Sequence, residues 1–109
     1  NQEEGDDRMI RHIVMFRFAD RADGRTKAEN MELAKQKLMG LYGVVPTLRA
    51  MDVRFACAKT DETSFDFVLT ADFDDRDGLE AYRVHPAHRA VSAFMGAVRE
   101  GRACVDFEI

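Results

Sequence analysis

The sequence lacks several features that mark large classes of proteins. No uninterrupted apolar run approaches the roughly 20 residues that span a bilayer, so we expect no membrane partner. Lys and Arg number 16 against 20 Asp and Glu, and this balance offers no basic field that would attract nucleic acid. The only cysteines are Cys57 and Cys104, which excludes a disulfide-dense scaffold. We expect both to be reduced thiols in the core.

The length of 109 residues suits one hydrophobic core and one domain. Residues 1–8 are polar and without pattern, and they carry four acids and one arginine, which is most of the net charge of −4. We interpret residues 1–8 as a tail without function and residues 9–109 as the domain. The acidic start lacks the basic and apolar segments of an export signal, so the cytoplasm is the expected location.

Alternation of apolar and polar residues predicts four strands, at 10–18, 48–58, 64–74 and 102–109. The second and third of these runs are joined by a short polar turn, and we expect them to pair as an antiparallel hairpin. Asp66 and Asp72 alternate with the phenylalanines of the third run. They are therefore expected to face solvent or an interface.

Helical periodicity and capping residues predict the helices. A stripe formed by Met31, Ala34, Leu38, Leu41 and Tyr42 predicts a helix at 27–42, opened by a capping box between Thr26 and Glu29 and stopped by Gly43. A cap at Asp77 predicts a short helix that reaches Val84 before Pro86. Because proline is favoured at the first helical position, a further helix is expected at about 86–99, capped by Gly101.

The order strand, helix, two strands, broken helix, strand is typical of an α+β ferredoxin-like domain with a split βαβ pattern. Its four-stranded antiparallel sheet would have strand order 4-1-3-2, with the helices on one face. Cys57 and Cys104 would then lie on opposite edge strands, too far apart to bridge. The other face would carry Ile13, Met15 and Val68, so we expect a second copy of the chain to cover it in a homodimer.

Three histidines and a tyrosine are the candidate functional residues. His88 lies in the first turn of the last predicted helix, where the helix dipole favours a neutral ring that can accept a proton. Tyr82 ends the preceding helix, and its hydroxyl is a candidate acid or hydrogen-bond donor. His12 lies with Phe16 on the apolar face of the first strand, where it would line a small-molecule pocket between sheet and helices.

A structural interpretation of the same residues stays open. A histidine beside proline commonly caps a helix, and a tyrosine at a helix end is often a core ring with its hydroxyl in water. His85 and His88 have the spacing of a metal-binding pair, but Pro86 interrupts the helix between them. We therefore expect no metal and no other cofactor.

Four stretches of the sequence together resemble the stress-responsive A/B barrel (Dabb) domain family, over residues 9–109. They are IRHIVMFRF at 10–18, SFDFVL at 64–69, LEAYRVHPAH at 79–88 and VDF at 105–107. The resemblance implies a dimeric α/β barrel, formed by two ferredoxin-like sheets packed face to face. Members of the family include plant stress-induced proteins, bacterial proteins without an assigned activity, and polyketide cyclases that close a ring by an intramolecular aldol-type condensation.

The resemblance also implies roles for individual residues. The tyrosine and the second histidine of the motif are the proposed acid/base pair of the cyclases, which makes Tyr82 and His88 the candidate catalytic residues here. We place His12, Phe16 and His85 in the pocket, which would take a small apolar ligand.

Three functions compete for this sequence. The first is a Dabb homodimer with a stress-related role or an unassigned activity, in which the motif supports the fold. The second is a cyclase-like enzyme in which His88 takes a proton next to a carbonyl while Tyr82 donates to the oxyanion. The third is a cofactor-free or haem-linked monooxygenase of the same barrel fold, which the lack of tryptophan and of an evident haem ligand makes less favourable.

Overall fold

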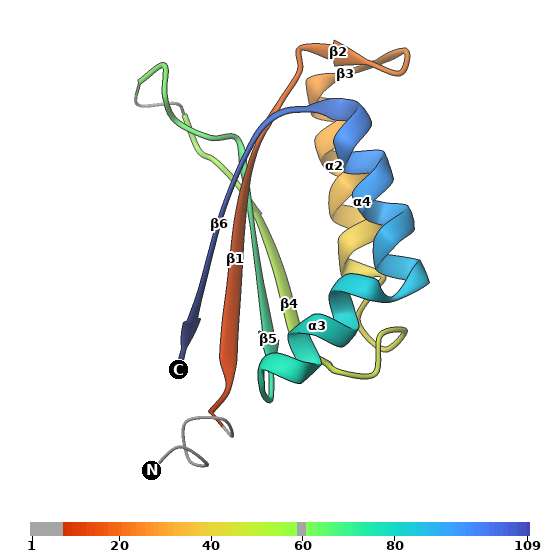
Figure 1. The fold of residues 1–109 in the computed structure, drawn as a ribbon. Helices are drawn as coiled ribbons and strands as arrows, with labels where there is room; N and C mark the ends of the chain where they lie inside the picture. Colours follow the sequence, from red (N-terminus) through yellow and green to blue (C-terminus); the bar gives the residue numbers. More distant parts are fainter. Residues whose placement is uncertain (1–7, 59–60) are drawn as a thin grey trace.

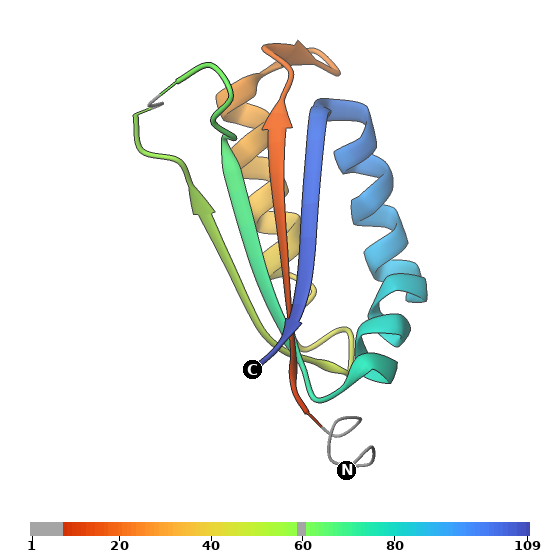
Figure 2. The ribbon, with the colours of Figure 1, turned by 60° about the vertical axis from the view of Figure 1, so that its left-hand side comes forward.

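The computed structural model describes residues 8–58 and 61–109, so most of the predicted tail and part of the predicted 59–63 turn lie outside the described residues. One layer is an antiparallel sheet of β1 (Ile10–Phe18), β4 (Leu48–Phe55), β5 (Phe67–Phe73) and β6 (Arg99–Glu108), in the order β4-β5-β1-β6. The helices form a second layer on one face of this sheet (Figure 1). The turned view in Figure 2 shows β6 and β4 at the two edges. The predicted ferredoxin-like α+β fold and strand order are confirmed.

Helix α2 (Lys27–Met39) begins with the predicted capping box. The Thr26 hydroxyl accepts from the Glu29 amide at 3.2 Å, and the Glu29 carboxylate accepts from the Thr26 amide at 2.8 Å. The helix ends three residues before the predicted 42, at a cap formed by Gly40 instead of Gly43. Leu41 remains buried beyond the helix end, but Tyr42 is exposed, so the predicted apolar stripe stops at Leu41.

Helices α3 (Arg76–Val84) and α4 (Pro86–Val98) follow the predicted break at Pro86, with different caps. Asp75, rather than Asp77, caps α3 by accepting from the Gly78 amide at 2.8 Å. The last strand starts directly at Arg99, whose amide closes α4, so Gly101 lies within β6 and caps nothing. The chain therefore passes from α4 into β6 without a loop, three residues earlier than predicted.

A small hairpin of β2 (Arg21–Ala22) and β3 (Arg25–Thr26) replaces the loop predicted before α2. Its turn residues Asp23 and Gly24 have φ values of 53° and 76°, a left-handed pair that Asp and Gly tolerate better than most residues. The hairpin lies at the end of the sheet where α2 begins (Figure 1).

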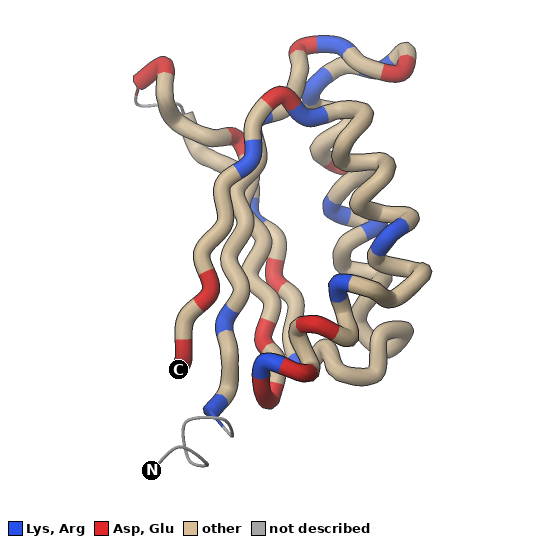
Figure 3. The backbone as a smooth tube through the Cα atoms, in the orientation of Figure 1, with Lys and Arg blue, Asp and Glu red and all other residues tan. Residues whose placement is uncertain are grey.

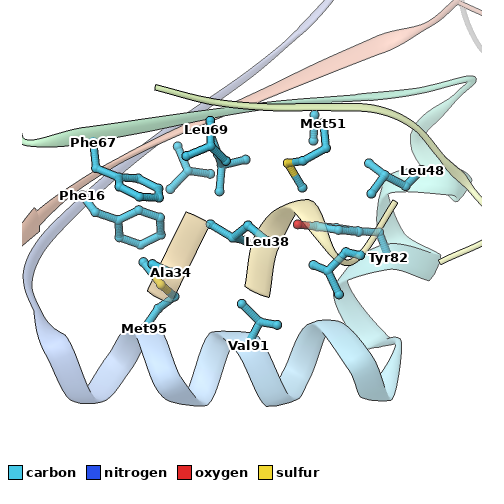
Figure 4. Packing of buried hydrophobic residues seen from close by; sticks show 14 of the residues in the cluster. Phe16, Ala34, Leu38, Leu48, Met51, Phe67, Leu69, Tyr82, Val91 and Met95 are labelled. Carbon is cyan, nitrogen blue, oxygen red and sulfur yellow. The ribbon is translucent and has the colours of Figure 1, made fainter. Parts of the chain in front are cut away.

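The hydrophobic core fills the layer between sheet and helices (Figure 4). Alternate residues of β1 and β5 point into it, which follows from the period of two that predicted these strands. The Phe18 and Phe67 rings lie 5.2 Å apart and the Phe16 and Phe67 rings 5.9 Å apart, within the range of favourable aromatic pairs. The face of β1 that carries His12 is therefore a core face.

Asp66 is buried, and its predicted place in solvent or at an interface is wrong. Its side chain accepts from the Phe18 amide at 2.8 Å, and Lys27 Nζ lies 3.5 Å from the carboxylate. Only 5% of the residue is exposed. Asp72 does lie on the other face of the sheet, where Arg11 donates to both of its carboxylate oxygens at 2.9 and 3.0 Å.

The sheet face away from the helices carries exposed apolar side chains. Val105 is 55% exposed and Phe107 42%, and in the register of the sheet they lie opposite Ile13 and Arg11. Met15, from the middle of β1, adds to this face, which no part of the described chain covers. Cys57 and Cys104 are free and exposed, so the prediction that they are core thiols is wrong. Cys104 lies on the edge strand β6, as predicted, but Cys57 lies beyond the end of the edge strand β4, which is shorter than the predicted 48–58.

Candidate functional site

A pocket of about 290 Å³ lies between α4 and the sheet. Its floor is apolar, with Val14, Leu69 and Met95 among the lining residues. The side of the pocket formed by the edge strand β6 is more polar, because Arg99, Arg102 and Cys104 line it. The volume is at the lower end of the range of small-molecule sites, so the pocket suits a ligand of modest size.

Tyr82 reaches this pocket from the last turn of α3. The residue is 1% exposed, and its hydroxyl has no hydrogen-bond partner among residues 8–58 and 61–109. Burial raises the pKa of the phenol, which keeps it protonated. The hydroxyl points into the layer between sheet and helices (Figure 4). An unpaired buried hydroxyl costs about 1–3 kcal/mol, and a ligand carbonyl in the pocket would remove that cost.

His88, in the first turn of α4, packs against Tyr82 with 4.2 Å between ring centroids. Its Nδ1 lies 3.3 Å from the Arg83 carbonyl oxygen. A carbonyl can only accept, so Nδ1 carries the hydrogen and Nε2 keeps a lone pair. Burial lowers the pKa of the ring, the hydrogen bond to the Arg83 carbonyl raises it, and the nearby charges of His12, Arg102 and Arg83 lower it; the net shift is downward. His88 is therefore neutral at pH 7, chiefly because of burial.

His12 lies on the other side of Tyr82, with 6.2 Å between ring centroids. Its Nδ1 hydrogen-bonds the Asp106 carboxylate at 2.5 Å, and Arg83 donates to the other oxygen of that carboxylate at 3.1 Å. Burial lowers the pKa of His12 below its ordinary value, and Arg83 and Arg102 add to this effect, while the Asp106 carboxylate raises the pKa; the net shift is downward, so this ring is also neutral at pH 7. A neutral ring that donates through Nδ1 presents Nε2 as an acceptor.

The structure brings together His12, Phe16, Tyr82 and His88 at one pocket. His85, which we had also placed there, is not among the lining residues. It caps α4 instead, with its Nδ1 accepting from the Ala87 amide at 3.0 Å. The reason is the break at Pro86, which separates the directions of the two histidine side chains.

Five polar residues surround these groups and were not predicted from the sequence: Arg83, Arg99, Arg102, Cys104 and Asp106. All except Arg83 belong to β6. Asp106 lies directly opposite His12 in the β1–β6 register. The first and last strands were predicted to pair, and residues that lie opposite each other in a sheet share a face. This pairing could have placed Asp106 beside His12, but the sequence does not give the register of the two strands.

His12, Cys104 and Asp106 could in principle hold a metal, because their ligand atoms all lie within 4.8 Å of one another. The charges around them do not favour this. Asp106 is already shared by His12 and Arg83, and burial and Asp106 raise the pKa of the Cys104 thiol. A metal would need the thiolate, so we describe the cluster as a hydrogen-bond network.

Comparison with known proteins identifies the family. The Dabb (Stress responsive A/B Barrel Domain) model matches residues 10–109. The chain belongs to the Dabb family. It is 32% identical over 83 residues to an uncharacterized protein of Streptomyces coelicolor, a match that covers 75% of this chain and 81% of the relative.

Crystal structures of similar proteins agree with this Dabb fold. A dimeric ferredoxin-like protein of unknown function from Thermobifida fusca has a TM-score of 0.77 and 31% identity, over 94% of this chain and 92% of that one. A dimeric protein of ferredoxin-like fold from Bacteroides fragilis has a TM-score of 0.78 and 27% identity, over 93% and 96%. Both relatives are dimers of unknown function. No helix in the described part of the chain is long and apolar enough to cross a membrane.

Proposed function

We propose that this Dabb protein is a homodimeric enzyme that removes a proton next to the carbonyl group of a small molecule and stabilises the resulting enolate. The observation that carries the proposal is the Tyr82 hydroxyl, which is buried without a partner in the described structure, beside the neutral ring of His88. A purely structural tyrosine gains nothing from this arrangement, because the unpaired hydroxyl costs stability.

The proposed reaction uses each group in the protonation state described above. His88 Nε2 takes the proton from the carbon next to the carbonyl, and the electrons of the broken C–H bond form the C=C bond of the enolate. The carbonyl oxygen gains the negative charge and accepts a hydrogen bond from the Tyr82 hydroxyl. In a molecule with a second carbonyl, the enolate carbon attacks that group and closes a ring, and the alkoxide that forms takes the proton held on His88, which restores the neutral base. This is the aldol-type condensation implied by the family resemblance.

His12 and Asp106 complete the site in this proposal. The Asp106 carboxylate holds the His12 Nδ1 hydrogen, so His12 Nε2 stays an acceptor for a hydroxyl or amide of the substrate. His12 is therefore a substrate-binding residue, and His88 is the base because its ring is in contact with Tyr82.

The homodimer is supported by the exposed apolar face of the sheet and by the dimeric relatives. Met15, Val105 and Phe107 would be buried against the same face of a second copy. Because this face is opposite to the helices, dimerisation leaves the pocket between α4 and the sheet uncovered.

Proton exchange tests the proposed function without knowledge of the natural substrate. The probes are 3-(4-acetylphenyl)propionic acid and its amide, small aryl ketones in which the ring separates the ketone from the acid or amide group. The methyl protons next to the ketone are replaced by deuterium in D₂O once an enolate forms. We expect the protein to accelerate this exchange, followed by NMR, for at least one probe. His88→Gln and Tyr82→Phe should each lower the rate about 10²-fold or more.

The matched control is His85→Gln, which removes a histidine of the same motif that lies outside the pocket. This variant should retain the exchange rate when it is assayed well below its melting temperature. The proposal fails if the wild type exchanges neither probe faster than His88→Gln does. In that case the structural role, in which the motif supports the fold and the dimer, is the better account.

A further inference from the structure

Three arginines line the pocket that contains His12, Tyr82 and His88. They are Arg83, Arg99 and Arg102, and the pocket lining contains no Asp or Glu. From this arrangement we propose that the pocket binds a carboxylate-bearing carbonyl compound, with the carboxylate held by Arg99 and Arg102. This inference rests on the proposed function for the chemistry at the carbonyl end of the ligand. It adds that the ligand carries a negative charge at its other end.

The arginines differ in their partners. Arg83 is neutralised by Asp106 at 3.1 Å and lies 4.0 Å from Glu80. Within the described residues, no hydrogen bond or ion pair is formed by the guanidinium of Arg99 or of Arg102. An arginine beside a pocket that has no acidic partner is a natural ligand for an anion, because its planar group can donate two parallel hydrogen bonds to a carboxylate.

The register of the sheet places these charges along one side of the pocket. Asp106, Cys104 and Arg102 lie opposite His12, Val14 and Phe16 in turn, and Arg99 lies opposite Phe18. Figure 3 shows basic positions near the start of β6 and acidic positions toward its end, with one acidic position, Glu100, between the two arginines; Glu100 does not line the pocket. From His12 to Phe16 the backbone of β1 rises by about 13 Å. Arg99 and Arg102 therefore lie toward one end of the pocket, and the reactive groups lie toward the other, together with the paired Arg83.

The side chains between the two ends of the pocket determine the polarity and size of the middle part of the ligand. Val14, Val91 and Met95 line it, so the body of the ligand should be apolar. The volume of about 290 Å³ accommodates a molecule with one aromatic ring or a short acyl chain. The predicted apolar ligand is thus extended to an amphipathic one, with a carbonyl at the end near Tyr82 and a carboxylate at the end near Arg102.

The test compares the binding of 3-(4-acetylphenyl)propionate, in which an aromatic ring separates the ketone from the carboxylate, with that of its amide, by isothermal titration calorimetry on the full chain at pH 7.5. The two molecules share the ring and the ketone, and they differ in the negative charge. We expect the acid to bind about tenfold or more tightly, since hydrogen bonds to charged groups are the stronger ones. Raising the salt concentration should weaken the binding of the acid and leave that of the amide unchanged.

Variants assign the effect to the arginines. Arg102→Gln and Arg99→Gln should each remove most of the preference for the acid, with little effect on the affinity for the amide. Arg89→Gln is the matched control, because Arg89 is exposed on α4 and does not line the pocket. It removes the same charge from the chain and should leave the preference unchanged. Melting curves of all the variants show whether each one is folded at the assay temperature.

The outcomes separate this inference from the proposed function. Tight binding of the acid without deuterium exchange supports the carboxylate site and contradicts the proposed chemistry. Exchange of both probes at equal rates and equal affinities supports the chemistry and overturns the carboxylate site. The carboxylate site is also overturned if neither probe binds, or if Arg89→Gln reduces the preference as much as Arg102→Gln does.

Discussion

The Nδ1 atom of His12 lies 2.5 Å from a carboxylate oxygen of Asp106, across the pairing of β1 with the edge strand β6. This contact joins a buried ring at the centre of the sheet to an exposed residue at its edge. Through Arg83, which donates to the same carboxylate, it also joins the sheet to the end of α3. Three elements that are distant in the sequence therefore meet around one carboxylate.

Asp106→Asn is expected to lower the pKa of His12 further. The carboxylate raises that pKa through its hydrogen bond and its charge, and without it burial and Arg83 act unopposed. NMR titration of the histidine rings measures the change. Asp74→Asn, which removes a surface carboxylate paired with Arg49, should leave the titration of His12 unchanged. An unchanged His12 in Asp106→Asn would show that the contact does not persist in solution.

The free energy of unfolding should fall when the solution is acidified below about pH 6.5. Burial lowers the pKa values of His12 and His88 in the folded protein from their ordinary value of 6.5. Below 6.5 the unfolded chain therefore binds protons that the folded chain does not, and stability is lost as the pH falls toward the folded pKa values. Above 6.5 this contribution is fully present.

Urea denaturation at several pH values between 5 and 7.5 measures this loss. The double variant His12→Gln, His88→Gln should lose less stability over the same interval than the wild type, because it lacks both of the groups that bind the extra protons. An equal loss in the two proteins would mean that other groups cause the pH dependence.

Tyr82→Phe should leave stability unchanged or raise it by up to about 1 kcal/mol, because it removes a buried hydroxyl that has no partner in the described chain. The same variant should lose deuterium exchange. This opposite behaviour of stability and activity is typical of a functional group held at a cost to the fold. A clear loss of stability with normal exchange would show that the hydroxyl is structural.

Val105→Glu is expected to separate the proposed homodimer into monomers. The substitution places a charge on the exposed apolar face of the sheet, next to Ile13 on β1. Sedimentation velocity measures the change in mass. Val44→Glu is the matched control, since Val44 is similarly exposed but lies in the turn after α2. The interface is elsewhere if Val105→Glu is still a dimer, and a monomeric wild type would contradict the homodimer itself.

The strands were predictable because one face of each inner strand is buried, which imposes a period of two on the residues from Ile10 to Phe18 and from Phe67 to Phe73. His12 was placed correctly for the same reason. Asp66 was placed wrongly, because it lies just before β5 and its partners, the Phe18 amide and Lys27, come from distant parts of the chain. A pattern of neighbours along the sequence contains no information about such partners.

The candidate site was likewise predictable only where its residues are neighbours in the sequence. Tyr82 and His88 belong to one short motif and were predicted together, whereas Asp106 and Arg102 become part of the site only through the register of β6 against β1. His85 shows the reverse error. Its place in the motif suggested the pocket, but the local geometry at Pro86 uses its ring as a helix cap.

The proposed site is tested most directly by a crystal structure of the protein with 3-(4-acetylphenyl)propionate at saturating concentration. We expect a dimer with the ketone oxygen within hydrogen-bond distance of the Tyr82 hydroxyl, the methyl carbon next to the ketone facing His88 Nε2, and the carboxylate at Arg99 and Arg102. A pocket closed by its own side chains, or a ligand bound away from Tyr82 and His88, would contradict the proposed site.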